Sequence, residues 1–255
     1  MDKTLAGCTF IRNGIEFDYC FIETIKSIQK CCDHVFIVDA GSDDGTVCEL
    51  KKMQDNKTTI IYLSKLDWDN QHGKEKLSYF SNIAIQAAQD AGYEYQLYIQ
   101  CDEIIHENSY SEVRRAIEQN NEAYMCSRIN LWKSCYMKLD VPLNKMPCSI
   151  SVIRLTKTKY RCVGDAESLD APANLGFINN IIIYHVGFVR KREVMKSKII
   201  NMQQGVFAME HYDSKLDQCE IFNPDLWFNP KTDLKPIDEP LPKLIQQWAK
   251  ERIYE

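Results

Sequence analysis

Apolar and polar positions follow two different periods along the first third of the chain. Compact runs rich in β-branched residues predict buried strands, and they lie at 5–11, 34–40 and 58–63. Apolar residues at helical spacing between these runs predict helices at 17–28 and 47–54. Strands that alternate with helices in this way are typical of a parallel sheet with right-handed crossovers.

A longer amphipathic segment from Lys74 to Ala91 predicts a helix that leads into an apolar strand at 95–100. Ser109 and Glu112 then form a capping-box pattern, which marks the start of another helix. Beyond residue 122 the strand-like runs follow one another without long helices, and they lie at 124–132, 148–156 and 180–189. The second half is therefore expected to be mixed and partly antiparallel.

These patterns divide the chain into three parts, 1–122, 123–222 and 223–255. The second part contains a predicted helix over Arg192–Met209. The third part contains five prolines: Pro224, Pro230, Pro236, Pro240 and Pro242. Proline at this density favours a tail that wraps over the rest of the molecule instead of folding alone.

Composition narrows the class of protein. A chain of 255 residues with 45% hydrophobic and 26% charged residues is ordinary for one soluble globular unit. A net charge of −5 gives no general electrostatic reason to bind nucleic acid. The amino terminus lacks a secretory signal, and no apolar stretch approaches the ~20 residues that cross a bilayer. We therefore expect a cytoplasmic protein, with peripheral contact with a membrane left open.

The cysteine pattern excludes two kinds of site. The sequence has 11 cysteines but no CxxC spacing, so it predicts neither a zinc ribbon nor a thioredoxin-like redox pair. Reduced thiols that pack as small hydrophobic side chains are expected instead.

Acidic residues gather where the predicted strand at 34–40 ends. In open α/β sheets the ligand lies beyond the carboxyl ends of the strands, so Asp39 is expected to face a ligand. Asp43, Asp44 and Thr46 directly precede the next helix, where such side chains are ordinary caps. We expect these three to be structural.

A second acidic site, Asp102 in the run QCDE, follows the predicted strand at 95–100. A carboxylate at such a strand end can hold a hard divalent cation, which takes oxygen ligands and shares them with substrate phosphates. Asp102 is therefore a candidate metal ligand. The alternative is a turn carboxylate that merely closes the strand.

Three segments, TFIRN at 9–13, VDAGSDDGT at 38–46 and LYIQCDE at 97–103, occur in this order at predicted strand ends. Together they resemble the family-two glycosyltransferases, whose patterns run T-x-x-R/K-N, V-D-D-G-S-x-D-G-T and D-x-D. The resemblance covers roughly residues 4–110 well. It implies the GT-A fold, an α/β fold in which helices flank a Rossmann-like, mainly parallel sheet and the acceptor side is mixed or antiparallel.

The resemblance also implies a donor, a UDP-, GDP- or dTDP-sugar, whose diphosphate is bridged by Mn²⁺ or Mg²⁺ to the D-x-D carboxylates. Residues 1–122 would then bind this donor and 123–222 would carry the acceptor and catalytic side. Carried over by position, the residues that face the nucleoside are Thr9, Arg12, Asn13 and Asp39. Asp102 matches the final aspartate of D-x-D, and Gln100 stands in place of the first.

GT-A enzymes often supply a late histidine to the same metal, and His185, at the end of an apolar strand, is the matching residue. The alternative is a histidine at the edge of the core, bonded to backbone. A basic segment follows, with Arg190, Lys191, Lys196 and Lys198. These side chains can neutralise the donor diphosphate, Arg190 above all, or form a solvated helix face.

Inverting transfer is a single displacement, so a carboxylate must lie near the acceptor hydroxyl. The loop between Gly164 and Pro172 offers Asp165, Glu167 and Asp170. Asp165 is the first candidate for the catalytic base and Glu167 the second. Aromatic side chains stack on sugars, and Trp132 and Trp227 are candidates for an acceptor cleft.

The sequence thus favours a glycosyltransferase that moves a sugar to a hydroxyl of a glycan, lipid-linked or protein acceptor, as in polysaccharide assembly. Two other functions stay open. A sugar-nucleotide nucleotidyltransferase is less favoured because the first strand lacks a glycine-rich phosphate loop after it. A non-catalytic nucleotide- or glycan-binding protein of the same fold is compatible with Gln100.

Overall fold

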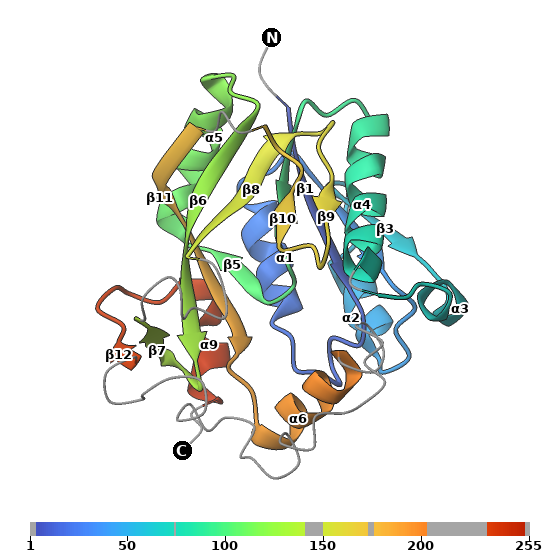
Figure 1. The fold of residues 1–255 in the computed structure, drawn as a ribbon, viewed down its shortest axis with the longest axis vertical. Helices are drawn as coiled ribbons and strands as arrows, with labels where there is room; N and C mark the ends of the chain where they lie inside the picture. The colour runs from blue at the N-terminus through green and yellow to red at the C-terminus, as the bar shows by residue number, and fades with distance from the viewer. Residues whose placement is uncertain (1–3, 74, 141–149, 173–175, 203–233, 253–255) are drawn as a thin grey trace.

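The computed structural model describes residues 4–73, 75–140, 150–172, 176–202 and 234–252. Its strands are β1 (Leu5–Ile11), β2 (His34–Asp39), β3 (Thr58–Tyr62), β4 (Tyr95–Tyr98), β5 (Glu103–Ile105), β6 (Ala123–Trp132), β7 (Ser134–Leu139), β8 (Ser151–Lys157), β9 (Cys162–Val163), β10 (Ser168–Leu169), β11 (Gly176–Phe188) and β12 (Leu234–Pro236). Its helices are α1 (Phe21–Gln29), α2 (Thr46–Met53), α3 (Lys65–Asp69), α4 (Glu75–Asp90), the 3₁₀ turn η1 (Glu107–Ser109), α5 (Tyr110–Glu118), α6 (Arg192–Asn201) and α9 (Lys243–Lys250). Helices flank the curled central sheet (Figure 1).

The described part of the chain forms one large sheet in the order β12-β7-β6-β8-β4-β1-β2-β3. From β4 to β3 the strands are parallel, as expected for βαβ units. From β4 to β12 each pair along this order is antiparallel. β11 then lies parallel to β6 and antiparallel to β5. The predicted α/β fold, with a parallel first half and a mixed second half, is confirmed.

Strand β1 shows why the sheet is covered on both faces. Leu5 and Ile11 belong to a core cluster with Ile25 of α1. Cys8 belongs to a second cluster with Phe80 of α4. Successive side chains of a strand point to opposite faces, so α1 and α4 cover opposite sides of the same strands. Burying each of these large side chains contributes roughly 1.5–3 kcal/mol.

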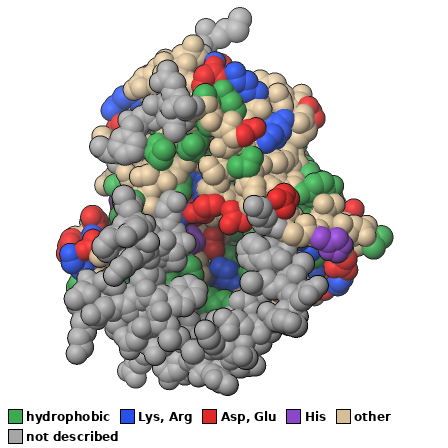
Figure 2. Space-filling model, viewed as in Figure 1, with side chains coloured by type: hydrophobic (Ala, Val, Ile, Leu, Met, Phe, Trp, Pro, Cys, Tyr) green, Lys and Arg blue, Asp and Glu red, His purple; other side chains and the backbone are tan. Residues whose placement is uncertain are grey.

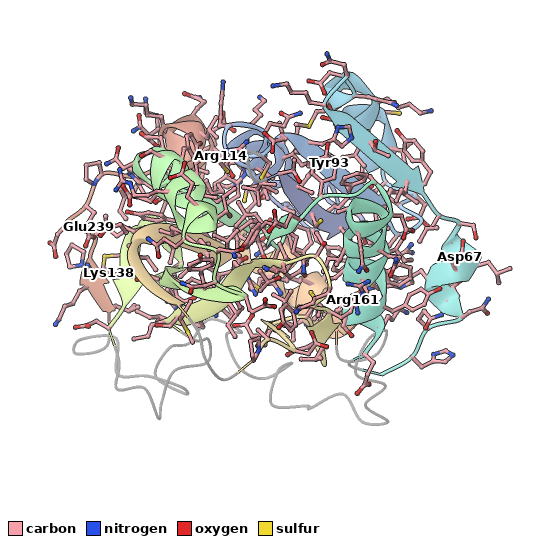
Figure 3. The ribbon with its side chains drawn as sticks, turned by 90° about the horizontal axis from the view of Figure 1, so that it is seen from above. Asp67, Tyr93, Arg114, Lys138, Arg161 and Glu239 are labelled. Atoms are coloured by element: carbon pink, nitrogen blue, oxygen red, sulfur yellow. The ribbon has the colours of Figure 1, made fainter. Side chains whose placement is uncertain are left out.

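The same layers are visible from above (Figure 3). Arg114 of α5 pairs with Asp33 at 2.6 Å on the α1 side. Arg161 donates to Gln86 of α4 at 2.5 Å on the other side. Lys138 of β7 and Glu239, 3.2 Å apart, lie together at the far end of the sheet.

Most elements follow the predicted periods. The helix expected at Lys74–Ala91 is α4, and the helix expected from Arg192 onward is α6, described to residue 202. The sequence patterns did not predict α3, β5, β7 or α9. The described cysteines are free thiols, and all but Cys48 are buried, as expected.

The predicted capping box is wrong, although the helix is present. Ser109 precedes α5 but makes no side-chain cap; its hydroxyl accepts from the Ile182 N–H at 2.9 Å. Glu112 pairs with Arg115 at 2.8 Å. The turn η1 begins instead with His106, whose ring accepts from the Asn108 N–H at 3.1 Å. A tertiary contact to β11 has replaced the local cap.

The described part of the tail adds one strand to the large sheet and one helix that packs against it. β12 pairs with β7, and Ile245 and Trp248 of α9 are buried in a cluster with Tyr184 of β11. Pro224 and Pro230 lie outside the described residues. The division at residues 122 and 222 stays a prediction. No described helix has the length and apolar character to cross a membrane.

Candidate functional site

A pocket of about 210 Å³ opens beyond the carboxyl ends of β1 and β4. It is lined from these two strands, the β9–β10 loop, helices α3, α4 and α6, and the segment before α1. Acidic side chains rim a recess on this face of the molecule, and basic side chains lie within it (Figure 2). The location agrees with the rule that α/β sheets bind ligands at the carboxyl ends of their strands.

The pocket brings together four of the residues chosen from the sequence: Arg12, Asp102, Asp165 and Glu167. Gln100 and Lys198 line it as well. These residues are far apart in the chain and meet because β1, β4, the β9–β10 loop and α6 converge there.

Four other candidates for donor binding do not line the pocket: Thr9, Asn13, Arg190 and Asp39, the last of which is described below. Thr9 is fully buried, with its hydroxyl 3.2 Å from Sγ of Cys101. Asn13 donates its side-chain amide to Asp43 at 2.9 Å. The guanidinium of Arg190 donates to backbone, including the Phe17 carbonyl at 2.7 Å. Each of the first three is part of the scaffold around the pocket, and a direct role in donor binding stays a prediction.

The acidic segment after β2 is largely structural, as expected. Asp44 accepts from the Thr46 N–H at 3.0 Å and from the Glu16 N–H at 2.7 Å. The Thr46 hydroxyl accepts from the Ile15 N–H at 3.2 Å. The first of these contacts satisfies the Thr46 N–H at the start of α2, whose N-cap, Gly45, has no side-chain cap, and the other two fix the segment that follows Arg12.

Asp39, at the end of β2, differs from its neighbours. One carboxylate oxygen accepts from the Ser42 N–H at 3.2 Å. The other oxygen is buried and has no hydrogen-bond partner among the described residues. Burial raises the pKa of Asp39. An unsatisfied buried carboxylate oxygen costs free energy that a ligand donor at this point would recover.

Arg12 is the cation on the β1 side of the pocket. Its guanidinium donates to the Ala40 carbonyl at 3.0 Å and to the Gly41 carbonyl. The guanidinium carbon lies 5.0 Å from the ring centroid of Trp68. These contacts, to two carbonyls and an aromatic ring, hold the charge in place, so Arg12 presents a positive group to the pocket.

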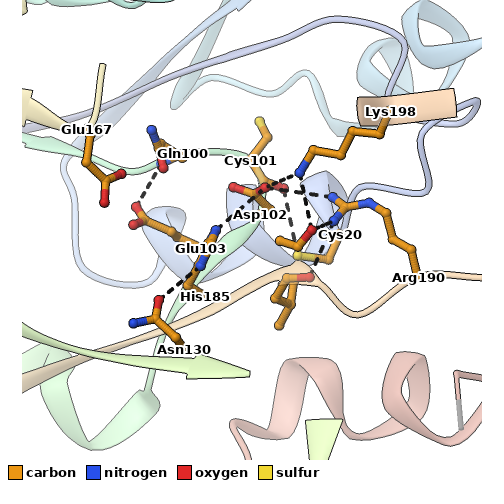
Figure 4. A network of polar contacts seen from close by, with 12 residues as sticks. Cys20, Gln100, Cys101, Asp102, Glu103, Asn130, Glu167, His185, Arg190 and Lys198 are labelled. Carbon is orange, nitrogen blue, oxygen red and sulfur yellow. Dashed lines mark hydrogen bonds and ion pairs between the residues drawn. The ribbon is translucent and has the colours of Figure 1, made fainter. Parts of the chain in front are cut away.

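Asp102 is the centre of a charged cluster (Figure 4). Its Oδ2 atom lies 3.3 Å from Nζ of Lys198, 3.7 Å from NH2 of Arg190 and 3.9 Å from Nε2 of His185. Burial raises the pKa of Asp102, but these three groups outweigh burial and hold its pKa well below the usual range. Asp102 is therefore ionised at neutral pH.

His185 lies behind Asp102 and is buried. Its Nδ1 lies 3.1 Å from Oδ1 of Asn130 on β6. Burial lowers the pKa of His185 to about 4, against the opposing effect of Asp102. The ring is neutral at pH 7, and its Nε2 faces the carboxylate.

The side chains around Asp102 can be compared with the ligands that the expected divalent cation needs. Asp102 and His185 supply one carboxylate and one imidazole, and no group of three metal-binding side chains exists in the described ranges. Lys198 and Arg190 already face the Asp102 oxygen that a metal would use. Permanent cations at 3.3 and 3.7 Å repel a divalent ion. As arranged here, these residues do not fit Mn²⁺ or Mg²⁺.

A buried charge network lies next to the Asp102 cluster. Glu103 is fully buried and accepts from Arg154 at 2.8 and 2.9 Å and from Arg128 at 3.1 Å. Burial raises the pKa of Glu103, but the two arginines outweigh it and lower that pKa. Glu103 also accepts from the Gln100 N–H at 3.1 Å. The network thus fixes the turn that carries Asp102.

The contacts of this network distinguish the two candidates for the catalytic base. Glu167 accepts from Arg128 and lies 3.7 Å from Arg154, so its charge is already paired. Asp165 is exposed, and its carboxylate accepts from the Glu167 N–H at 3.3 Å. A carboxylate engaged by two arginines is not free to approach an acceptor hydroxyl. The geometry favours Asp165.

Several pocket residues were missed or undervalued by sequence reasoning. Lys198, Asn201 and Met202 lie at i, i+3 and i+4 on α6, a spacing that puts them on one helix face. That spacing was a usable signal. Trp68 lines the pocket from α3. Trp132 does not line it: this side chain is buried, and its ring centroid lies 4.4 Å from that of Phe188. Trp227 lies outside the described residues.

Gly187 permits the close approach of His185 and Asp102. A Cβ at this position would lie 2.4 Å from Nε2 of His185 and 3.0 Å from Oδ2 of Asp102. We expect Gly187→Ala to lower the free energy of unfolding by about 1–3 kcal/mol, measured by denaturant titration. Ser197→Ala on the exposed face of α6 is the control and should stay within about 0.5 kcal/mol. A Gly187→Ala protein as stable as the parent would contradict this packing.

Comparisons with known proteins give no family assignment. No protein-family model matches the sequence, and no curated protein matches it. Among solved structures, the fold is similar to S. aureus TarS 1-349, with 13% identity and a TM-score of 0.47 over 90% of this chain and 73% of that chain. The complex of the same protein with UDP gives 12% identity, a TM-score of 0.47 and the same coverage.

A second kind of solved structure is also similar. 4-Diphosphocytidyl-2C-methyl-D-erythritolsynthase from Anaerococcus prevotii DSM 20548 has 9% identity and a TM-score of 0.44, over 78% of this chain and 96% of that chain. At these identities and TM-scores the similarities say nothing about activity. The function must be derived from the site itself.

Proposed function

We propose that the protein is a glycosyltransferase that takes its sugar from a nucleoside-diphosphate sugar. The observation that carries this proposal is that cationic side chains and an exposed carboxylate line the same pocket. Arg12 and Lys198 provide cations, and the exposed carboxylate of Asp165 lines the same space. A negatively charged leaving group and a hydroxyl nucleophile require these two kinds of group in one site.

The proposed reaction is an inverting single displacement. The acceptor oxygen forms a bond to the anomeric carbon of the donor sugar, and the bond from that carbon to the diphosphate oxygen breaks. The bonding electrons leave with the nucleoside diphosphate, and the acceptor's hydroxyl proton goes to the carboxylate of Asp165. The acceptor is a hydroxyl of a glycan, a lipid-linked sugar or a protein.

The nucleoside is proposed to lie at the carboxyl ends of β1 and β2. The unpartnered oxygen of Asp39 supports this position, because a ribose hydroxyl or a base N–H would satisfy it. Trp68 gives the pocket an aromatic wall beside Arg12. UDP and GDP are the first donors to test, and membership in family two and a role in polysaccharide assembly remain part of the proposal.

Donor hydrolysis tests this function without knowledge of the acceptor. Transferases of this chemistry are expected to pass the sugar slowly to water, so incubation with UDP-, GDP- and dTDP-sugars should release free sugar and nucleoside diphosphate from at least one of them. The products are separated by chromatography, and the protein denatured beforehand is the control.

Two other outcomes identify the alternatives. Tight nucleotide binding with no hydrolysis and no transfer would indicate a binding protein. Release of pyrophosphate from a nucleoside triphosphate and a sugar phosphate would indicate a nucleotidyltransferase. Either result would contradict the proposed function.

A further inference from the structure

Lys198 occupies the place beside Asp102 where a divalent cation was expected. Its Nζ atom lies 3.3 Å from Oδ2 of Asp102 and donates to the Gly187 carbonyl at 3.2 Å. The side chain reaches this point from α6, and Lys198 lines the pocket (Figure 4). A positive charge is therefore built into the wall of the pocket by the chain itself.

Several contacts hold this lysine in position. Nζ lies 5.1 Å from the ring centroid of Tyr19, and the guanidinium of Arg190 lies 4.5 Å from the same ring. Arg190 also donates to the Gly187 carbonyl. Because Arg190 is only 2% exposed and donates its Nε and NH1 groups to backbone carbonyls, it is a fixed charge behind the lysine. Lys198 is the member of this pair that faces the pocket.

The charges of the cluster favour an anion. One carboxylate, Asp102, faces two permanent cations, Lys198 and Arg190. The neighbouring carboxylates Glu103 and Glu167 are matched by Arg128 and Arg154. Counted over the described side chains, the cluster around Asp102 therefore carries more positive than negative charge, whether or not His185 is protonated. Such a wall attracts a diphosphate and repels a divalent metal ion.

We propose that the ammonium group of Lys198 binds the diphosphate of the donor and takes the role of the divalent cation, so that the protein binds nucleoside diphosphates without metal. This inference rests on the proposed function and specifies how its leaving group is stabilised. In it, Asp102 orients Lys198 and does not act as a metal ligand. Charge-assisted hydrogen bonds of an ammonium to phosphate oxygens supply the attraction.

Calorimetric titration of UDP and GDP into the full chain tests the inference, first in EDTA and then with added Mn²⁺. The wild-type protein should bind one of the two with the same affinity in both buffers. In EDTA, Lys198→Met should weaken that binding roughly 10- to 100-fold, the loss expected for one hydrogen bond between charged groups. Lys198→Arg should restore much of it, because the cation is retained.

The control is Lys250→Met, which removes an exposed lysine from α9 and should bind as the wild type does. Binding that requires Mn²⁺ would overturn the inference and leave the proposed function intact. Wild-type affinity in Lys198→Met would also overturn it. Absence of binding by UDP and GDP in both buffers, followed by the same result with dTDP, would contradict the proposed function itself. Thermal unfolding of each variant shows that a loss of binding does not come from a loss of folding.

Discussion

Asp165→Asn is expected to reduce sugar transfer or donor hydrolysis roughly 10²- to 10⁴-fold, the usual contribution of a positioned general base. Asparagine keeps the size of the side chain but accepts no proton. Asp165 is exposed at the pocket, in a turn where Gly164 and Ala166 have positive φ values of 58° and 63°. The described hydrogen bond of this carboxylate is to the Glu167 N–H and not to the cations of the Asp102 cluster, so the affinity for nucleoside diphosphate should change little.

Asp170→Asn is the matched control in the same loop. Asp170 accepts from the Arg161 N–H at 2.5 Å and does not line the pocket, so its turnover should equal that of the parent. Glu167→Gln should have a smaller effect than Asp165→Asn, because Glu167 is already paired with Arg128. Parental rates for both Asp165→Asn and Glu167→Gln would show that this loop is not catalytic.

Glu103→Gln is expected to lower the free energy of unfolding by about 3–5 kcal/mol, the range for removal of one partner from a buried ion pair. The substitution removes one of the two carboxylates, Glu103 and Glu167, that the buried Arg154 and Arg128 share, and it removes the fully buried one. Equilibrium unfolding in denaturant at neutral pH measures the change. The turn that carries Asp102 is held by the same carboxylate, so nucleotide binding should weaken as well.

Glu112→Gln removes a carboxylate of the same type from a more exposed pair with Arg115 on α5. Pairs of this kind contribute about 0–1 kcal/mol, so this control should stay close to the parent. A loss of less than about 1 kcal/mol in Glu103→Gln would mean that the buried network contributes little to stability.

The fold was predictable where the pattern is long and local. Phe80, Ala84 and Ala88 lie at i, i+4 and i+8, and this apolar stripe predicts α4 almost to its ends. β5 is only three residues long and exists because it pairs with β11, about 80 positions later. β7 pairs with β6, the strand directly before it, and also with the distant β12. Short elements held by distant partners leave little trace in the local sequence.

The site was predictable for residues that follow strands. Arg12 comes directly after β1, Asp102 lies four positions after the end of β4, and both line the pocket. Thr9 was expected there too, but it lies deeper in β1 than Ile11, which does line the pocket, and its side chain is fully buried. Lys198 reaches Asp102 only through the path of β11 and α6, which no local pattern reveals.

The chain's own cations explain why one carboxylate suffices at the second acidic site. With Gln100 in place of an aspartate, Asp102 alone carries charge in that pair of positions. In the structure this single carboxylate meets Lys198 and Arg190. The loss of the first D-x-D carboxylate, at Gln100, is therefore consistent with the presence of two cations beside Asp102.

The central claim is that this pocket binds a nucleoside diphosphate, with Arg12 and Lys198 as its cations. Titration of UDP, GDP and dTDP into the wild-type protein and into Arg12→Met, followed by calorimetry, tests it most directly. The account predicts binding of at least one of the three at a single site, and a weaker complex with Arg12→Met. No heat with any of the three, in EDTA or in Mn²⁺, would contradict it.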